Sequence, residues 1–327
     1  MRIKKVDYNI ANQRFDRYLR KYFKQYPDIK LSDIYSWIRK WIILVNNKRV
    51  KEDYRLLLWD EIKFNNIDSG EKKPKQLILD KENKIKELSL DDIKQLIIYE
   101  DENWVVFDKP AWIIMHSANK NKQLSMNDYI EKYCKLIWTG KIEESFKPSF
   151  GYRLDKDTSG VLIWAKNYQA LQYLNEIIRD RKIDKEYMTI VGGAMPKNLL
   201  VENNLEKVYN KKFWSSHMKI SKEGLHSKTE FWNKKTIQHQ VLGEISLVKV
   251  KLYTGRMHQI RVHLASEWFG MLGDITYGNP ALNRKMYKQL KINRQMLHCN
   301  KYSFENIDGK KISFESVLPS DFIKLIN

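Results

Sequence analysis

Gly151-Tyr-Arg-Leu-Asp-Lys-Asp-Thr-Ser-Gly160, followed by the apolar run Val161-Leu-Ile-Trp164, is the most informative stretch of this sequence. The pattern predicts a polar loop that leads into a buried strand. Arg153 and Asp155 are two positions apart, so in an extended backbone their side chains point to the same face. A plain turn, in which Asp155 or Asp157 accepts hydrogen bonds from nearby amides, explains the same residues. The segment alone does not decide whether Arg153 and Asp155 face a functional site or belong to a plain turn.

The chain around this segment alternates apolar β patterns with helical ones. It therefore predicts one large mixed α/β domain over residues 96–327. The expected strands include residues 96–99, 104–107, 161–164, 187–191 and 247–252, and the expected helices residues 169–179 and 258–267. Residues 67–95 are polar and lysine-rich and contain Gly70 and Pro74, which predicts a linker.

A second, smaller domain is predicted over residues 1–66. Apolar residues at helical spacing indicate a helix over 14–24 and another from Ser32. A strand at 42–45, a turn at Asn46-Asn47, a return strand at 48–50 and a further strand near 56–64 are expected to follow. Its cations are candidate contacts to RNA phosphates: Arg14, Arg17, Arg39, Lys40, Lys48 and Arg49. Solvated helix faces explain these cations equally well.

Charge points to a polyanionic partner. The chain has 327 residues with 59 Lys and Arg against 40 Asp and Glu, a formal charge of +19. A biased composition or an anionic membrane surface are the alternatives, but no apolar stretch reaches the ~18 residues of a membrane span, and the first residues lack a signal peptide's apolar core. The two cysteines are far apart, and His258 and His263 lack the i, i+4 spacing of metal ligands. We therefore expect a cytoplasmic protein without membrane attachment, disulfide or metal.

The stretch 151–160 resembles the Arg-Leu-Asp-x-x-Thr-Ser-Gly signature of the RluA-type pseudouridine synthases of ribosomal RNA. Three further blocks match in order, namely residues 100–110, Lys185-Glu186-Tyr187, and 254–264 with Gly273-Asp274. Residues 14–64 resemble the S4 RNA-binding domain that precedes such enzymes. The resemblance implies an α+β fold in which a small S4-type domain precedes a mixed α/β catalytic domain built on a largely antiparallel sheet.

The same resemblance implies roles for site residues. Asp155 corresponds to the catalytic carboxylate, acting as nucleophile or as base, and Arg261 to the arginine that keeps it ionised. Tyr187 corresponds to the tyrosine that stacks on uracil, although most strand tyrosines are core residues. Arg153 corresponds to the arginine that fills the gap left by the flipped nucleotide, and Leu297 is an expected wall of the base pocket. The isomerisation involves no redox step, so we expect no cofactor.

The expected function is isomerisation of specific uridines in 23S ribosomal RNA by a monomeric enzyme. Transfer RNA is the alternative substrate, and a small-subunit type of synthase is a related possibility. A non-catalytic S4-containing RNA-binding or ribosome-assembly protein would keep the fold without the chemistry. A basic membrane-associated protein is the most distant alternative.

Six positions depart from the family pattern, and one of them is Met257, which replaces a common Thr or Ser at the edge of the site. Tyr152 replaces a histidine, and we expect it to pack beneath the loop. Trp41, Trp59, Trp112 and Trp268 stand where relatives carry glycine, often with positive φ, which tryptophan adopts poorly. We hypothesise that the source organism decodes UGA as glycine and that the printed sequence decodes UGA as tryptophan. True tryptophans in the protein of an AT-rich genome are the alternative.

Overall fold

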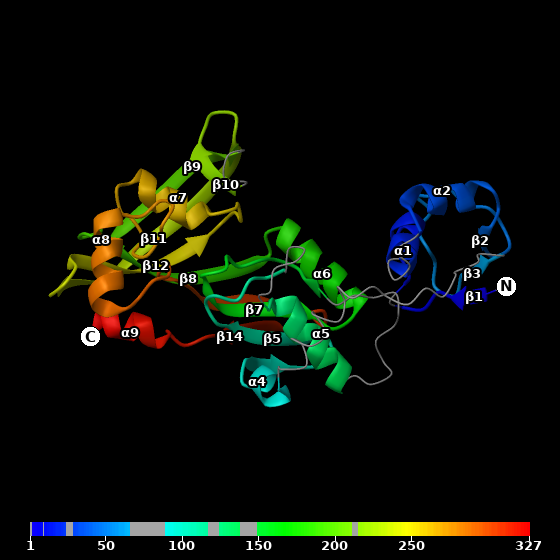
Figure 1. Cartoon of the computed structure of the whole chain (residues 1–327), viewed down its shortest axis with the longest axis horizontal. Coiled ribbons are helices and arrows are strands. Elements are labelled where there is room, and N and C mark those ends of the chain that lie inside the picture. Colours follow the sequence, from blue (N-terminus) through cyan, green and yellow to red (C-terminus); the bar gives the residue numbers. More distant parts are fainter. Residues whose placement is uncertain are drawn as a thin grey trace.

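The computed structural model of the chain describes residues 2–8, 10–23, 29–65, 89–116, 124–137, 149–210 and 215–327. Figure 1 shows a small N-terminal unit beside a larger body. Residues 67–88 of the predicted linker lie outside the described residues. Helix α4 (Leu90–Lys94) follows, and its Ile93 is buried in the core of the larger body, so the predicted linker extends too far. Within the described ranges, no helix is both long and apolar enough to span a membrane.

The N-terminal unit has its own small sheet and core. Its elements are β1 (Arg2–Lys5), α1 (Phe15–Tyr22), α2 (Leu31–Arg39), β2 (Ile43–Val45) and β3 (Glu61–Phe64), with strand order β1-β3-β2. The apolar faces of both helices pack with the strands in one cluster that includes Phe15 and Ile38. The predicted return strand at 48–50 is wrong, because Lys48 forms only an isolated bridge with Val45. The partner of β2 is the more distant β3.

The larger body is built on one sheet of 11 strands. Its main path runs β10-β9-β11-β12-β8-β13-β7-β5-β4, with β14 on β13 and β6 on β7. Among the described residues, the strand pairs of this sheet are antiparallel except β13 with β7, so the predicted mixed, largely antiparallel fold is confirmed. The strands are β4 (Ile97–Glu100), β5 (Trp104–Lys109), β6 (Ser149–Phe150), β7 (Ser159–Ala165), β8 (Ile183–Gly192), β9 (Asn198–Asn210), β10 (Ser215–Ile220), β11 (Leu225–His239), β12 (Gly243–Leu252), β13 (Leu297–Glu305) and β14 (Lys311–Glu315).

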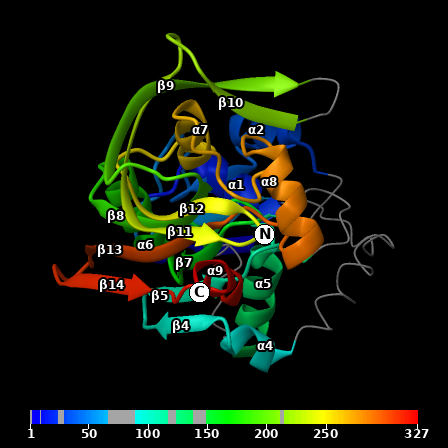
Figure 2. The same cartoon turned by 90° about the vertical axis from the view of Figure 1, so that its left-hand side faces the viewer.

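Helices lie around this sheet. They are α5 (Met126–Ile137), α6 (Tyr168–Arg179), α7 (Gln259–Ser266), α8 (Pro280–Lys285) with the π-helical turn η2 (Met286–Leu290), and α9 (Ser320–Ile326). Figure 2 shows β9 and β10 extending away from the core, with α7 below them. The arm from β9 to β11 has no counterpart in the sequence prediction, whereas α6, α7 and the five predicted strands of this domain are present.

The parallel seam between β7 and β13 requires a glycine. Gly160 has φ of +109°, and a Cβ placed there would lie 2.2 Å from the carbonyl oxygen of Cys299. Only a residue without a side chain allows the two backbones to approach this closely. The glycine of the Thr-Ser-Gly segment therefore fixes where loop 151–158 ends, next to the first residues of β13.

The four tryptophans singled out in the sequence all have a positive φ, a backbone conformation that favours glycine. Their φ angles are 63° at Trp41, 72° at Trp59, 78° at Trp112 and 65° at Trp268. None of the other tryptophans within the described residues has positive φ. Trp268 is also 94% exposed, which is unusual for so large an apolar side chain. The predicted positive φ is confirmed, and the decoding hypothesis stays a prediction.

The double variant Trp41→Gly/Trp268→Gly should be more stable than the printed sequence. Relief of the left-handed backbone, worth ~1–2 kcal/mol per residue, outweighs the extra freedom of an unfolded glycine, worth ~0.4–1 kcal/mol. Thermal unfolding should show a higher Tm, whereas Trp232→Gly, at a tryptophan without positive φ, should lower it. A lower Tm for the double variant would contradict the strain argument. Peptide masses from the native source test the decoding itself, and UGG codons would end that hypothesis.

Candidate active site

Loop 151–158, which carries Asp155, is held from below by a buried lysine. Lys109 is fully buried at the end of β5 and donates hydrogen bonds to the carbonyls of Lys156 (3.0 Å) and Thr158 (2.7 Å). A third bond goes to the carbonyl of the following proline (2.9 Å), so all three protons of an ammonium are used. Burial lowers the pKa of Lys109 to about 7, and Asp157 opposes this shift. Lys109 thus fixes the loop through backbone carbonyls, and the carboxylate of Asp155 takes no part in these bonds.

A buried arginine holds the other side of the loop. Arg294 donates to the carbonyl of Asp157 (3.3 Å) and to Oγ of Ser159 (3.4 Å). Its Nε and Nη2 bind both oxygens of Asp321 on α9, at 2.5 and 2.7 Å. The C-terminal helix is therefore tied to the loop by one guanidinium.

Tyr152 packs beneath the loop, as predicted. Its ring is stacked on Tyr302 with centroids 4.7 Å apart. Its hydroxyl donates to the carbonyl of Val161 (2.9 Å) and accepts from the amide of Ile163 (3.2 Å). A tyrosine therefore links the loop to β7 and β13 at the position where the family pattern has histidine.

Arg261 is shared by two carboxylates. Its Nη1 donates to Oδ2 of Asp155 (3.0 Å), while Nε and Nη2 donate to Oδ2 and Oδ1 of Asp274 at 2.6 and 2.8 Å. Asp274 is 1% exposed and also accepts from the amides of Thr276 and Tyr277. Burial alone would raise the pKa of Asp274, but the hydrogen bonds from Arg261 lower it overall. Burial likewise opposes the charge of Arg261, yet its bonds to Asp274 raise its pKa.

Two buried polar residues on α7 aim Arg261 at the loop. Gln259 donates to Oγ1 of Thr229 (2.8 Å) on β11, and Nδ1 and Nε2 of His263 lie 2.9 Å from the hydroxyls of Thr229 and Ser227. Residues four apart share one helix face, so Arg261, midway between them, projects from the opposite face. Burial lowers the pKa of His263 to about 4, which keeps it neutral at pH 7.

Asp155 opens into a cavity of about 80 Å³. The structure brings all five predicted site residues to this cavity, whose walls include Arg153, Asp155, Tyr187, Arg261 and Leu297. Tyr187 on β8 is 7% exposed, and burial raises its pKa well above the usual value. Asp155 keeps a third of its side chain exposed, and Arg153 is exposed at the mouth.

A larger hollow of about 270 Å³ lies between β4 and β14. Its walls hold no buried charged residue, since Glu315 is exposed. The smaller cavity is therefore the candidate active site.

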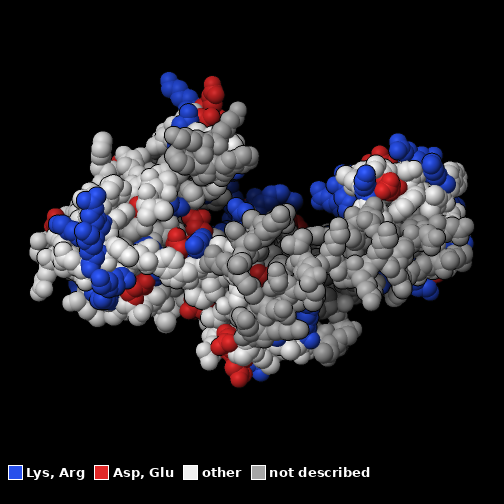
Figure 3. All heavy atoms as spheres, in the orientation of Figure 1, with Lys and Arg blue, Asp and Glu red and all other residues white. Residues whose placement is uncertain are grey.

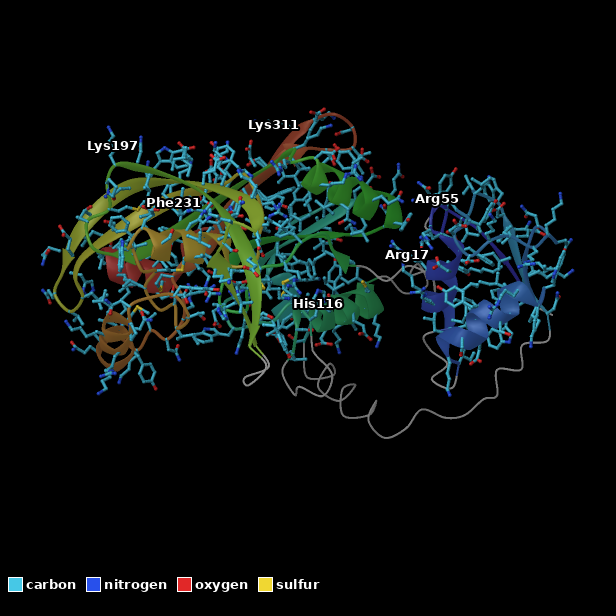
Figure 4. The ribbon with its side chains drawn as sticks, turned by 90° about the horizontal axis from the view of Figure 1, so that it is seen from above. Arg17, Arg55, His116, Lys197, Phe231 and Lys311 are labelled. Atoms are coloured by element: carbon cyan, nitrogen blue, oxygen red, sulfur yellow. The ribbon has the colours of Figure 1, made fainter. Side chains whose placement is uncertain are left out.

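The predicted RNA-binding cations differ in their availability. Five are exposed, and these are Arg17, Arg39, Lys40, Lys48 and Arg49. Arg14 is partly buried, and its Nε is paired with Oδ1 of Asp16 at 3.1 Å. Figure 4 shows Arg17 on the side of the N-terminal unit that is turned toward the larger body.

Sequence reasoning assigned no role to three residues that hold this site together. Asp274 lies in a Gly-Asp pair that the resemblance had already picked out, and Lys109 precedes Pro110 in another matched block. Arg294 carried no signal beyond being a cation near an apolar run. Among the described residues, no three His, Cys, Asp or Glu side chains gather where they could hold a metal ion.

Residues 103–266 match the RNA pseudouridylate synthase family. The chain is 31% identical to ribosomal large subunit pseudouridine synthase C of Buchnera aphidicola subsp. Schizaphis graminum, over 98% of this chain and 95% of that protein. The chain belongs to the RNA pseudouridylate synthase family. The synthase is also 31% identical to the protein of the same name from Vibrio vulnificus, over 91% of this chain and 87% of that one.

Solved structures share the fold of the synthase. Human RNA pseudouridylate synthase domain containing 4 aligns with a TM-score of 0.56 and 20% identity, over 75% of this chain and 95% of that chain. Human RNA pseudouridylate synthase domain containing 1 gives a TM-score of 0.53 at 20% identity, over 68% of this chain and 82% of that chain.

Asp274→Asn should reduce kcat on RNA by about 100-fold or more while the Kd for RNA changes little, because Arg261 loses the partner that orients it. Glu100→Gln is the matched control, since it breaks the partly buried ion pair between Lys166 and Glu100 (2.9 Å), which does not contact the loop of Asp155. Both variants should lose stability in thermal unfolding. Equal loss of kcat in the two variants would mean that Asp274 acts through stability alone.

The synthase should lose stability between pH 6.5 and pH 4 through His263. An unfolded histidine keeps the usual pKa of 6.5, whereas the folded one has a pKa of about 4. In this window the unfolded chain binds the proton that the folded chain excludes, so stability falls as pH falls. Denaturant unfolding at pH 7 and pH 5 should show a smaller pH effect in His263→Gln. An equal pH effect in both proteins would refute the assignment.

Proposed function

We propose that the synthase isomerises uridine to pseudouridine in 23S ribosomal RNA, with Asp155 as its catalytic residue. The substrate is suggested by relatives named ribosomal large subunit pseudouridine synthase C that align over nearly the whole chain. The observation that carries the catalytic assignment is the 3.0 Å bond between Arg261 Nη1 and Asp155 Oδ2 at the wall of the cavity.

The reaction exchanges one bond of the ribose for another. The C1′–N1 glycosidic bond breaks, the uracil turns, and C1′ joins C5, while C5 loses a proton and N1 gains one. Atoms and electrons balance without an oxidant or reductant. Asp155 either attacks C1′ as a nucleophile or removes a ribose proton, and both routes need an ionised carboxylate. The guanidinium of Arg261 places a positive charge and a hydrogen-bond donor 3.0 Å from Oδ2 of Asp155.

The other cavity residues suit a flipped nucleotide. The ring of Tyr187 and the side chain of Leu297 are apolar surfaces for the uracil, opposite a polar rim. Burial raises the pKa of Tyr187, and its hydroxyl is hydrogen-bonded to the thiol of Cys299, so the ring rather than the hydroxyl is what Tyr187 offers to the base. The exposed planar cation of Arg153 can stack in the gap that the nucleotide leaves, which offsets part of the unstacking energy.

The N-terminal unit, in this proposal, is an S4-type domain that adds affinity for RNA. Its exposed cations Arg39, Lys40, Lys48 and Arg49 are available to phosphates. We also propose a cytoplasmic monomer. Both cysteines are buried free thiols, as suits a reducing compartment, and all five cavity residues come from one chain.

Asp155→Asn should abolish pseudouridine formation in 23S ribosomal RNA transcripts while RNA binding persists. Asp157→Asn is the matched control, because it removes a carboxylate of the same loop that does not contact Arg261 directly, and it should retain activity within about tenfold. Pseudouridine mapping by carbodiimide labelling, run in parallel on transfer RNA, gives the readout. Activity in Asp155→Asn would overturn the catalytic assignment. A wild type that binds RNA without modifying it would favour the assembly protein.

A further inference from the structure

One segment of the catalytic domain is positively charged throughout. Between Asp274 and Glu305 the chain contains no Asp or Glu, whereas it contains six Lys and Arg residues. Four of them are exposed on α8, on η2 and just after it, and we call this set the basic stripe: Arg284, Lys285, Lys288 and Lys291. Figure 3 shows a column of cations where Figure 1 places α8.

The basic stripe is not neutralised by the protein itself. No member forms an ion pair with a described residue, whereas lysines elsewhere on the surface do, such as Lys219 with Glu206 at 3.3 Å. Arg284 and Lys285 lie on α8, Lys288 lies on η2 and Lys291 follows it directly, so the four cations are close together along one continuous segment. Uncompensated like charges on one segment repel each other, so the stripe is suited to an anion that the chain does not supply.

The helix beneath the stripe is fixed to the active site. The side-chain oxygen of Asn283 accepts from the amide of Gly273 (2.7 Å), and its Nδ2 donates to the carbonyl of Asp274 (2.8 Å). Asp274 in turn binds Arg261, which binds Asp155. Whatever binds the stripe is therefore held in a constant position relative to the cavity.

The apolar side of the same helix is already used. Met286 is 1% exposed and packs in a core cluster with Leu282 and Leu290. An amphipathic helix that binds a membrane surface inserts such an apolar face into the lipid, whereas here that face is packed inward and Tyr287 is the one large aromatic exposed on α8 and η2. The remaining binding chemistry is electrostatic, and the polyanion that the cavity already requires is RNA.

We propose that the basic stripe binds backbone phosphates of the substrate RNA outside the flipped nucleotide. This inference rests on the proposed function. The phosphates would belong to the strand or stem that flanks the target uridine. Contacts of this kind carry affinity and orientation rather than sequence information, so the stripe positions the RNA while the cavity selects the nucleotide.

The triple variant Arg284→Gln/Lys285→Gln/Lys288→Gln tests the proposal. The control Lys197→Gln/Lys310→Gln/Lys311→Gln removes the same charge from exposed positions, and Figure 4 places Lys197 and Lys311 on the edge of the molecule away from α8. The measurements are Kd for a 23S ribosomal RNA transcript from 50 to 300 mM KCl, and kcat at saturating RNA. Thermal unfolding verifies that both variants are folded.

The stripe variant should lower the slope of log K against log salt by about 2 to 3, and weaken binding about 10-fold or more at low salt. Its kcat should be unchanged, and the control should resemble wild type. A wild-type slope in the stripe variant, or an equal loss in the control, overturns the proposal. If wild type binds the transcript but forms no pseudouridine, the proposed function fails. The salt dependence of RNA binding then still tests whether the basic stripe binds phosphates. If wild type binds anionic vesicles but no RNA, both fail.

Discussion

The rest of the site depends on one buried guanidinium that is divided between two carboxylates. Removing Arg261 and Asp274 from water is unfavourable, and their paired hydrogen bonds are what offset it. Because Asp274 occupies Nε and Nη2, only Nη1 remains for Asp155. The three groups together keep one net negative charge, located on the carboxylate that meets the cavity. That negative charge suits either proposed route, attack on an electron-poor sugar carbon or removal of a ribose proton.

Around this interaction the protein immobilises the backbone and leaves the reactive side chain accessible. Lys109 and Arg294 bind main-chain oxygens of the loop from two sides, and both side chains are buried. A shift of about 1 Å in a catalytic group can reduce a rate by about 100-fold, so this rigidity supports the role that we propose for Asp155.

Much of the fold and site was predictable because the relevant signals are local. Apolar runs located the central strands, and the matched blocks supplied the five cavity residues. The arm from β9 to β11 was not predicted because its inward-facing residues are partly polar. Ser227 and Thr229 on β11 are fully buried, although polar residues in a sequence usually indicate a solvent-exposed position. The pairing of β2 with β3 escaped for a different reason. Asn46 and Asn47 both have positive φ and suggest a hairpin, while the true partner lies farther along the chain.

The seam between Gly160 and Cys299 has a consequence for how the enzyme matures. β7 and β13 are far apart in sequence, and the contact from Arg294 to Asp157 spans 137 positions. Contacts of such separation form late, since a long chain must close before they can stabilise anything. A nascent chain that has already displayed Asp155 still lacks Leu297, Arg294 and α9. The cavity is therefore complete only once β13 and α9 have packed against β7 and the loop of Asp155.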